Sequence, residues 1–162
     1  MNDIAVITGV AGGYDSPQEQ PDIENVDYIF FTDGESMPEK DGCWQVADLN
    51  APSHLDPRRQ AKFPKCYPQQ YPILKNYKYV IWMDGTMGIQ KESYPEQILS
   101  YMDNGVVFSP HFDDRDNYSE ATITAHPKYH NEPLAEQAEF YRSVGMPKGI
   151  RLLECTTLAW DP

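Results

Sequence analysis

Three apolar runs in the first half of the chain predict its central strands. They cover residues 4–10, 26–32 and 79–83, and each ends at a turn that contains glycine. In the run at 79–83 the apolar residues occupy successive rather than alternate positions, which is typical of a strand covered on both faces in a parallel sheet. The pattern therefore predicts an α/β fold with a mostly parallel central sheet flanked by helices.

Weaker patterns predict the remaining elements. Residues 43–47 suggest a short edge strand, 106–109 a further strand, and 150–160 a last strand or pair of strands. Apolar residues at helical spacing predict helices at 94–102 and 132–144, each followed by a glycine that ends it. Asp56 as N-cap and Pro57 at the first helical position predict one more helix, which Pro64 limits to about two turns.

Two of the predicted strands end in the same dipeptide. Asp33-Gly34 follows the strand at 26–32, and Asp84-Gly85 follows the strand at 79–83. If these strands are parallel neighbours, both carboxylates face the crevice at the carboxyl ends of the strands, where α/β sheets bind ligands. One carboxylate would suit a nucleoside, and the other a metal ion or a phosphate. The alternative is a pair of unrelated Asp-Gly turns.

Cations gather at one place in the chain. Arg58, Arg59 and Lys62 lie in or next to the helix predicted after Pro57, and residues three or four apart share a helix face. Such a face would clamp a diphosphate, because arginine offers a planar fork of donors and lysine a point charge. On charge alone, a solvated surface is the alternative.

The segment at 110–120 is the most polar of the chain and follows the strand predicted at 106–109. His111 with Asp113 or Asp114 would ligate a divalent cation, because imidazole and carboxylate groups suit such ions. We expect this segment to fold over the sheet edge so that His111 and Glu120 meet Asp84. A solvated surface loop is the alternative.

Length and charge narrow the possible classes of protein. The chain has 162 residues, enough for one domain with a real core and too few for two comfortable ones, so a single domain over residues 1–162 is expected. Its formal charge of −12 argues against nucleic acid or an anionic membrane as the main partner. The three cysteines show no CxxC spacing, the amino terminus lacks a basic signal region, and no apolar run approaches a membrane span. These features predict a cytoplasmic location.

The order of these segments resembles the glycosyltransferase-like domain of the TOD/MUCI type over nearly the whole chain. The resemblance begins with the strand at 4–10, Gly13-Tyr14-Asp15 and the stretch from Phe30 to Asp33. It continues with Arg59, Lys62 and the strand that ends in Asp84-Gly85, and then with His111, Arg115, Tyr118 and Glu120. It closes with Gln137, Tyr141, Gly145, Pro147 and Leu153-Glu154. No single element is specific, but their shared order is.

The resemblance implies a single Rossmann-like domain of the GT-A-like type and a glycosyltransferase activity. The partners would be a nucleotide-sugar donor and a carbohydrate or glycoconjugate acceptor, and the cofactor a divalent metal, manganese or magnesium. Asp33 would contact the nucleoside, Arg59 and Lys62 would hold the diphosphate, and Arg115 would be a further donor-binding residue. Asp84 and His111 would be metal ligands, and Asp84, His111 and Glu120 would be the catalytic residues.

One departure from the family pattern leaves alternatives open. The metal-binding Asp-x-Asp motif is incomplete, because the stretch reads Asp84-Gly85-Thr86. A first alternative is therefore a non-catalytic carbohydrate- or nucleotide-binding protein, or a virion-type structural protein, that retains the fold. A second is a metal-dependent hydrolase that uses Asp84, His111 and Asp113.

Overall fold

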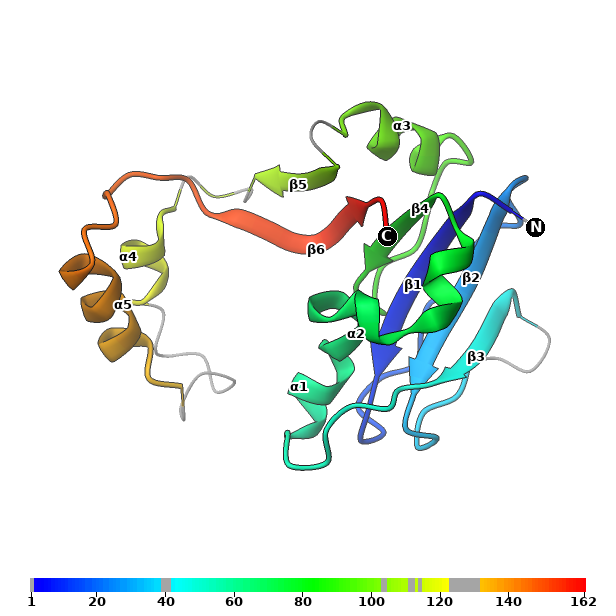
Figure 1. Ribbon diagram of the computed structural model, residues 1–162, viewed down its shortest axis with the longest axis horizontal. Coiled ribbons are helices and arrows are strands. Elements are labelled where there is room, and N and C mark those ends of the chain that lie inside the picture. The colour runs from blue at the N-terminus through cyan, green and yellow to red at the C-terminus, as the bar shows by residue number, and fades with distance from the viewer. Residues whose placement is uncertain (1, 39–41, 103–104, 111–112, 114, 123–131) are drawn as a thin grey trace. The chain divides into compact units, whose positions relative to one another are not determined.

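A computed structural model describes residues 2–38, 42–102, 105–110, 113, 115–122 and 132–162. The chain divides into two compact units (Figure 1). The first comprises Met1–Val107 and Thr156–Pro162, and the second comprises Phe108–Cys155. The expectation of a single domain stays a prediction.

The strands form one six-stranded sheet in the order β3-β2-β1-β4-β6-β5. Its strands are β1 (Ile4–Val10), β2 (Val26–Thr32), β3 (Trp44–Asp48), β4 (Tyr79–Met83), β5 (Val106–Pro110) and β6 (Leu153–Trp160). Strands β1, β2, β3 and β4 form parallel pairs, whereas β6 runs antiparallel to β4. The α/β class is confirmed, but the sheet is mixed rather than mostly parallel. An apolar run carries no information on strand direction, which explains why β6 was not foreseen as antiparallel.

Both faces of the first unit's sheet are covered, as the run at 79–83 predicted. On one face, Ile7, Phe31 and Trp82 form a buried cluster with Leu74, which lies in the short helix η2 (Pro72–Asn76). On the other face, a second buried cluster contains Val6 and Ile81, with residues of helix α3 (Tyr94–Ser100) packed against it. Alternate residues of each strand supply the two clusters, which is the period-two pattern of a strand.

The helix predicted after Asp56 begins where expected but is divided. Asp56 caps helix α1 (Pro57–Ala61) by accepting a hydrogen bond from the Arg59 backbone N–H at 3.1 Å. We expected Pro64 to end one helix of about two turns. Instead it lies in the first turn of a second short helix, α2 (Phe63–Cys66), where a missing backbone N–H is tolerated. A 3-10 turn, η1 (Pro68–Gln70), connects α2 to η2.

The second unit contains helices α4 (Asn117–Glu120) and α5 (Leu134–Ser143). Helix α5 confirms the prediction for 132–144, whereas α4 was not predicted. Asp116 and Ser119 form a reciprocal capping box at the start of α4, and Asp116 also accepts a hydrogen bond from Gly149. Met146 accepts a hydrogen bond from the Tyr118 hydroxyl, so the turn after α5 is tied to α4.

Candidate functional site at the carboxyl edge of the sheet

Asp33 and Asp84 lie at the same edge of the sheet. Asp33 follows β2 and Asp84 follows β4, and both strands run parallel to β1. Figure 1 shows these strands pointing in the same direction. The prediction of a common edge is therefore confirmed, and the loops at this edge, the carboxyl edge, form the candidate site.

Asp33 connects two of these loops. One of its carboxylate oxygens accepts a hydrogen bond of 2.7 Å from the Gly12 backbone N–H, in the loop after β1. The other accepts one of 3.1 Å from the Glu35 N–H. Gly12 has φ of 70°, which favours glycine, so the carboxylate holds a loop that other residues would strain. Asp33 is exposed, and its oxygens can still receive further donors from a ligand.

Asp84 is the centre of a compact polar cluster. Its Oδ1 accepts a hydrogen bond of 2.8 Å from the Trp82 indole Nε1. The Nζ atoms of Lys62 and Lys65 lie 3.8 and 3.7 Å from the same oxygen. The Lys65 Nζ also lies 5.3 Å from the centre of the Trp82 ring, a cation–π contact. The Lys65 side chain is only 9% exposed, whereas that of Lys62 is 47% exposed.

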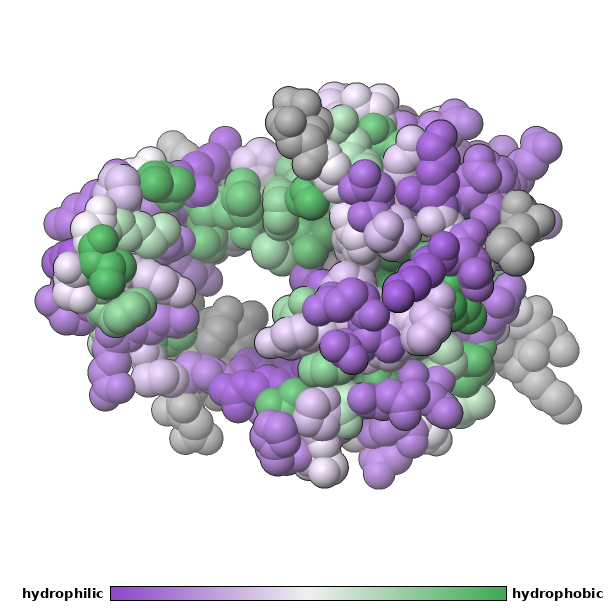
Figure 2. Space-filling view, viewed as in Figure 1, coloured by the Kyte–Doolittle hydropathy of each residue, from purple (hydrophilic) through white to green (hydrophobic). Residues whose placement is uncertain are grey.

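We call this group, Asp84 with Trp82, Lys62 and Lys65, the Asp84 cluster. It brings two ammonium groups to one carboxylate, within a chain whose formal charge is −12. Hydrophilic residues make up most of the visible surface of the first unit (Figure 2). Ammonium groups gathered at one place in an acidic protein attract an anionic ligand.

Arg59 pairs with Asp56, the residue that caps its own helix. Its Nη1 lies 2.7 Å from Asp56 Oδ2, and both side chains are largely exposed. Exposed ion pairs of this kind contribute little to stability and can exchange partners. Of the cations predicted to bind a diphosphate, Lys62 is directed to Asp84 and Arg59 to Asp56. Lys65, three residues after Lys62, was missed, although its spacing from Lys62 was a signal.

A close approach between α1 and β1 places the lysines. A Cβ atom on Gly9 would lie 2.4 Å from the carbonyl oxygen of Ala61, the last residue of α1. A Cβ atom on Gly12 would lie 2.7 Å from the Pro57 side chain. Both ends of α1 thus rest against glycines at the carboxyl end of β1. Only glycine allows this close contact, which places Lys62 and Lys65, both after α1 in the chain, at the carboxyl edge.

The loop after Asp84 is held by a buried amide. Gln20 is 9% exposed, and its Nε2 donates hydrogen bonds of 2.9 Å to the carbonyl oxygens of Gln18 and Met87. Its Oε1 accepts a hydrogen bond of 2.9 Å from the Ile89 N–H. The Gln18 N–H donates to the Gly85 carbonyl at 2.9 Å. These bonds fasten the segment that begins at Gly85 to a distant part of the chain.

The predicted metal site is not formed by the described residues. Across the part of the chain that the structure describes, no three His, Cys, Asp or Glu side chains are grouped to hold a metal ion. Asp84 Oδ1 already faces two ammonium groups, which repel a cation. His111, the other predicted ligand, lies outside the described residues. Of the two predicted ligands only Asp84 is described, so the metal site stays a prediction.

The second unit brings two of the predicted site residues together. Arg115 Nη1 lies 3.0 Å from Glu120 Oε2, and its Nη2 lies 2.8 Å from Asp113 Oδ2. Glu120 also lines a cavity of about 210 Å³ between α4 and α5, with the polar side chains of Gln137 and Tyr141. The expected approach of Glu120 and His111 to Asp84 stays a prediction.

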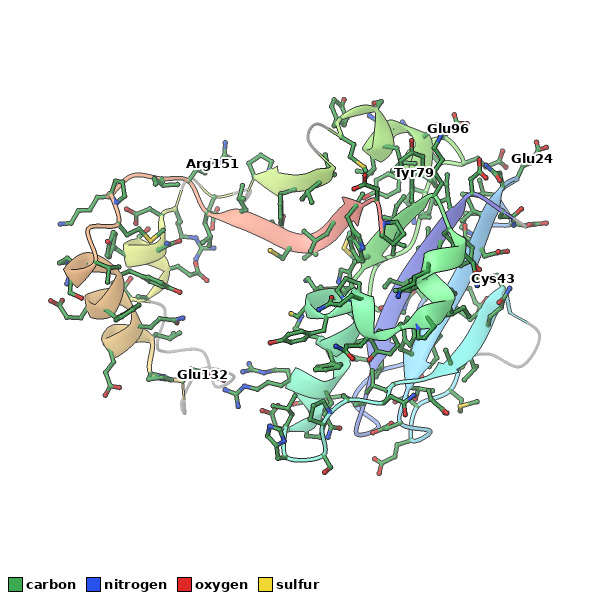
Figure 3. All side chains as sticks on the ribbon, viewed as in Figure 1. Glu24, Cys43, Tyr79, Glu96, Glu132 and Arg151 are labelled. Carbon is green, nitrogen blue, oxygen red and sulfur yellow. The ribbon has the colours of Figure 1, made fainter. Side chains whose placement is uncertain are left out.

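A cavity of about 690 Å³ lies at the other end of the strands, next to the start of β2 and β3. Four carboxylate side chains line it, those of Glu19, Asp22, Glu24 and Asp27. Figure 3 labels Glu24 and Cys43 near these strand starts. This lining repels anions. This end of the sheet is therefore less suited to an anionic ligand than the edge that carries Lys62 and Lys65.

Comparison with known protein families identifies the chain over most of its length. Residues 2–151 match the family described as TOD1/MUCI70, glycosyltransferase-like domain. The chain belongs to this family. Neither the curated proteins nor the solved structures give a match to this TOD1/MUCI70 chain. Among its described helices, none has the length and apolar character needed to cross a membrane.

Proposed function

We propose that this TOD1/MUCI70 domain transfers a sugar from a nucleotide-sugar donor to a carbohydrate or glycoconjugate acceptor, in a GT-A-like, Rossmann-like fold. Family membership supports a glycosyltransferase-like chemistry. The observation that carries the proposal is the convergence of Lys62 and Lys65 on Asp84 at the strand edge shared with Asp33. A cytoplasmic location stays a prediction of the sequence.

The chemical task at such a site is to stabilise the departing diphosphate. Negative charge grows on the leaving group as the sugar bond breaks, and positive groups already in place lower the barrier without reorganising. Lys62 and Lys65 supply that charge in the proposed site, and Arg59 keeps its predicted role of holding the diphosphate. Asp33 hydrogen-bonds the nucleoside. A divalent metal, if bound, would add the same neutralisation.

Glu120, which we propose on the sugar or acceptor side, lies in the second unit. Glu120 and Arg115 form an ion pair there, and Glu120 lines a cavity with neutral polar groups, which suits hydroxyl-rich ligands. We propose that Glu120 accepts the proton of the acceptor hydroxyl. His111 keeps its predicted role, lining the sugar or acceptor side with Glu120.

Binding and turnover test this function separately. We would screen uridine and guanosine diphosphates and their sugar conjugates by thermal shift, with and without manganese, and confirm hits by calorimetry. A specific ligand at 100 times its dissociation constant stabilises the folded state by about 2.7 kcal/mol. Release of nucleoside diphosphate from the donor, faster with an acceptor present, is expected of a transferase. Binding without turnover would favour the non-catalytic alternative, and the absence of any binding would reject the donor site.

A further inference from the structure

We infer that Lys62 and Lys65 form a diphosphate-binding pair that works without a divalent metal, and that Asp84 is their counter-ion rather than a metal ligand. This inference rests on the proposed function, because it assigns the donor's diphosphate to one part of that site. It replaces the predicted role of Asp84. The Asp84 cluster becomes a positioning device for two ammonium groups.

Lys65 is the first reason. Its side chain is only 9% exposed, and a buried ammonium group is costly unless a carboxylate and further polar contacts compensate it. Asp84 Oδ1 lies 3.7 Å from its Nζ, and the Trp82 ring lies beneath it at 5.3 Å. The Trp82 indole in turn donates to that same oxygen at 2.8 Å. These contacts fix the ammonium group in place before any ligand arrives.

The geometry of Asp84 Oδ1 is the second reason. The oxygen receives an indole N–H and two ammonium groups, all of them positive ends of dipoles or full positive charges. A divalent cation bound to this oxygen at about 2 Å would lie within a few ångströms of both ammonium groups and be repelled by both. Thr86 stands where a second carboxylate of an Asp-x-Asp motif would help to hold that cation.

The third reason is the match between the cluster and a diphosphate. Lysine binds phosphate oxygens as a point charge, and two lysines converging on one oxygen present two such charges to neighbouring phosphates. Lys62, being 47% exposed, is the group that a ligand meets first. The pair therefore offers the neutralisation that a metal would otherwise supply.

The two roles of Asp84 predict opposite effects of Asp84→Asn. The amide keeps an oxygen that can accept the Trp82 N–H but removes the negative charge that competes with phosphate for the lysines. As counter-ion, Asp84→Asn should tighten diphosphate binding, by roughly threefold for a partly screened charge. As metal ligand, it should weaken binding in the presence of manganese.

Calorimetry on the full chain with pyrophosphate, uridine diphosphate and guanosine diphosphate tests this, first in EDTA and then with manganese. We expect binding in EDTA, weakened about tenfold or more by Lys62→Met and by Lys65→Met, as when a hydrogen bond to a charged group is lost. The matched control is Lys78→Met. Lys78 also lies over an aromatic ring, with its Nζ 5.0 Å from the centre of the Tyr79 ring, but it lies just before the start of β4, at the opposite end of the strand from Asp84. Its removal should leave affinity unchanged.

The outcomes separate this inference from the proposed function. Binding only with manganese, lost in Asp84→Asn, would overturn the metal-free pair and leave the transferase proposal standing. Pyrophosphate binding in EDTA that depends on both lysines, without binding of any nucleotide, would support the pair and reject the nucleotide-sugar donor. The absence of binding by all three probes would overturn both. Lys62→Met keeps the test valid if Lys65→Met fails to fold, because Lys62 is largely exposed.

Discussion

Replacing the buried amide of Gln20 by Gln20→Leu should destabilise the first unit by about 2–4 kcal/mol. The substitution removes three hydrogen bonds, to the carbonyls of Gln18 and Met87 and from the N–H of Ile89. The Gln18 carbonyl keeps its bond of 2.9 Å from the Trp44 indole, so it remains satisfied. The buried Ile89 N–H and the half-buried Met87 carbonyl lose this partner. A fully buried group left without a partner costs about 1–3 kcal/mol, and the half-buried carbonyl adds less.

Urea denaturation followed by tryptophan fluorescence measures this change in unfolding free energy. The melting temperature should decrease by roughly 5–15 °C for a chain of this size. Gln90→Leu is the matched control, because Gln90 lies in the same loop but is exposed, with one bond of 3.3 Å to the Gly88 carbonyl. It should change the free energy of unfolding by less than about 0.5 kcal/mol. Equal effects of the two substitutions would refute the reasoning, because burial would then not decide the cost.

Two further predictions follow from single contacts. Gly9→Ala should cost about 1–3 kcal/mol by overpacking, since its Cβ would lie 2.4 Å from the Ala61 carbonyl oxygen. Gly88→Ala is the control, because a Cβ atom there would lie no closer than 3.6 Å to its nearest neighbour, the Gln90 Nε2. Its loss of unfolding free energy in the same urea titration should be much smaller. Hydrogen bonds from Gly149 and then Ser119 lower the pKa of Asp116 from 3.8 to about 2. The Asp116 carboxylate therefore stabilises the folded state above pH 4, and this stabilisation is lost as the pH falls towards 2. The difference in unfolding free energy between wild type and Asp116→Asn should shrink over that range. A difference that stays constant would contradict this.

The strands were predictable because burial on both faces leaves a local mark in the sequence. The runs that became β1, β2 and β4 are apolar at almost every position, and the following carboxylates reach a common edge because parallel strands end together. No comparable sequence pattern indicates that β6 runs antiparallel to β4. Helix α4 was also missed, since its four residues are polar and its capping box is its only local signal.

The partners of Asp84 could not be predicted for a different reason. Lys65 reaches it only because α1 rests on β1 at Gly9, so that the chain can turn into α2 over the strand edge. That contact depends on the packing of segments far apart in sequence. The sequence shows a glycine and a lysine, but not that the first permits the position of the second.

The place of β6 has a consequence for the order in which the protein is made. Asp84 donates its backbone N–H to the carbonyl of Thr156, and β4 pairs with β6 from Met83 to Val80. On the ribosome, β4 emerges long before β6, so one side of the nascent β4 stays unpaired while the second unit is synthesised. An unpaired strand edge is a template for aggregation. A fragment ending at residue 151, where the family match ends, would carry that open edge permanently.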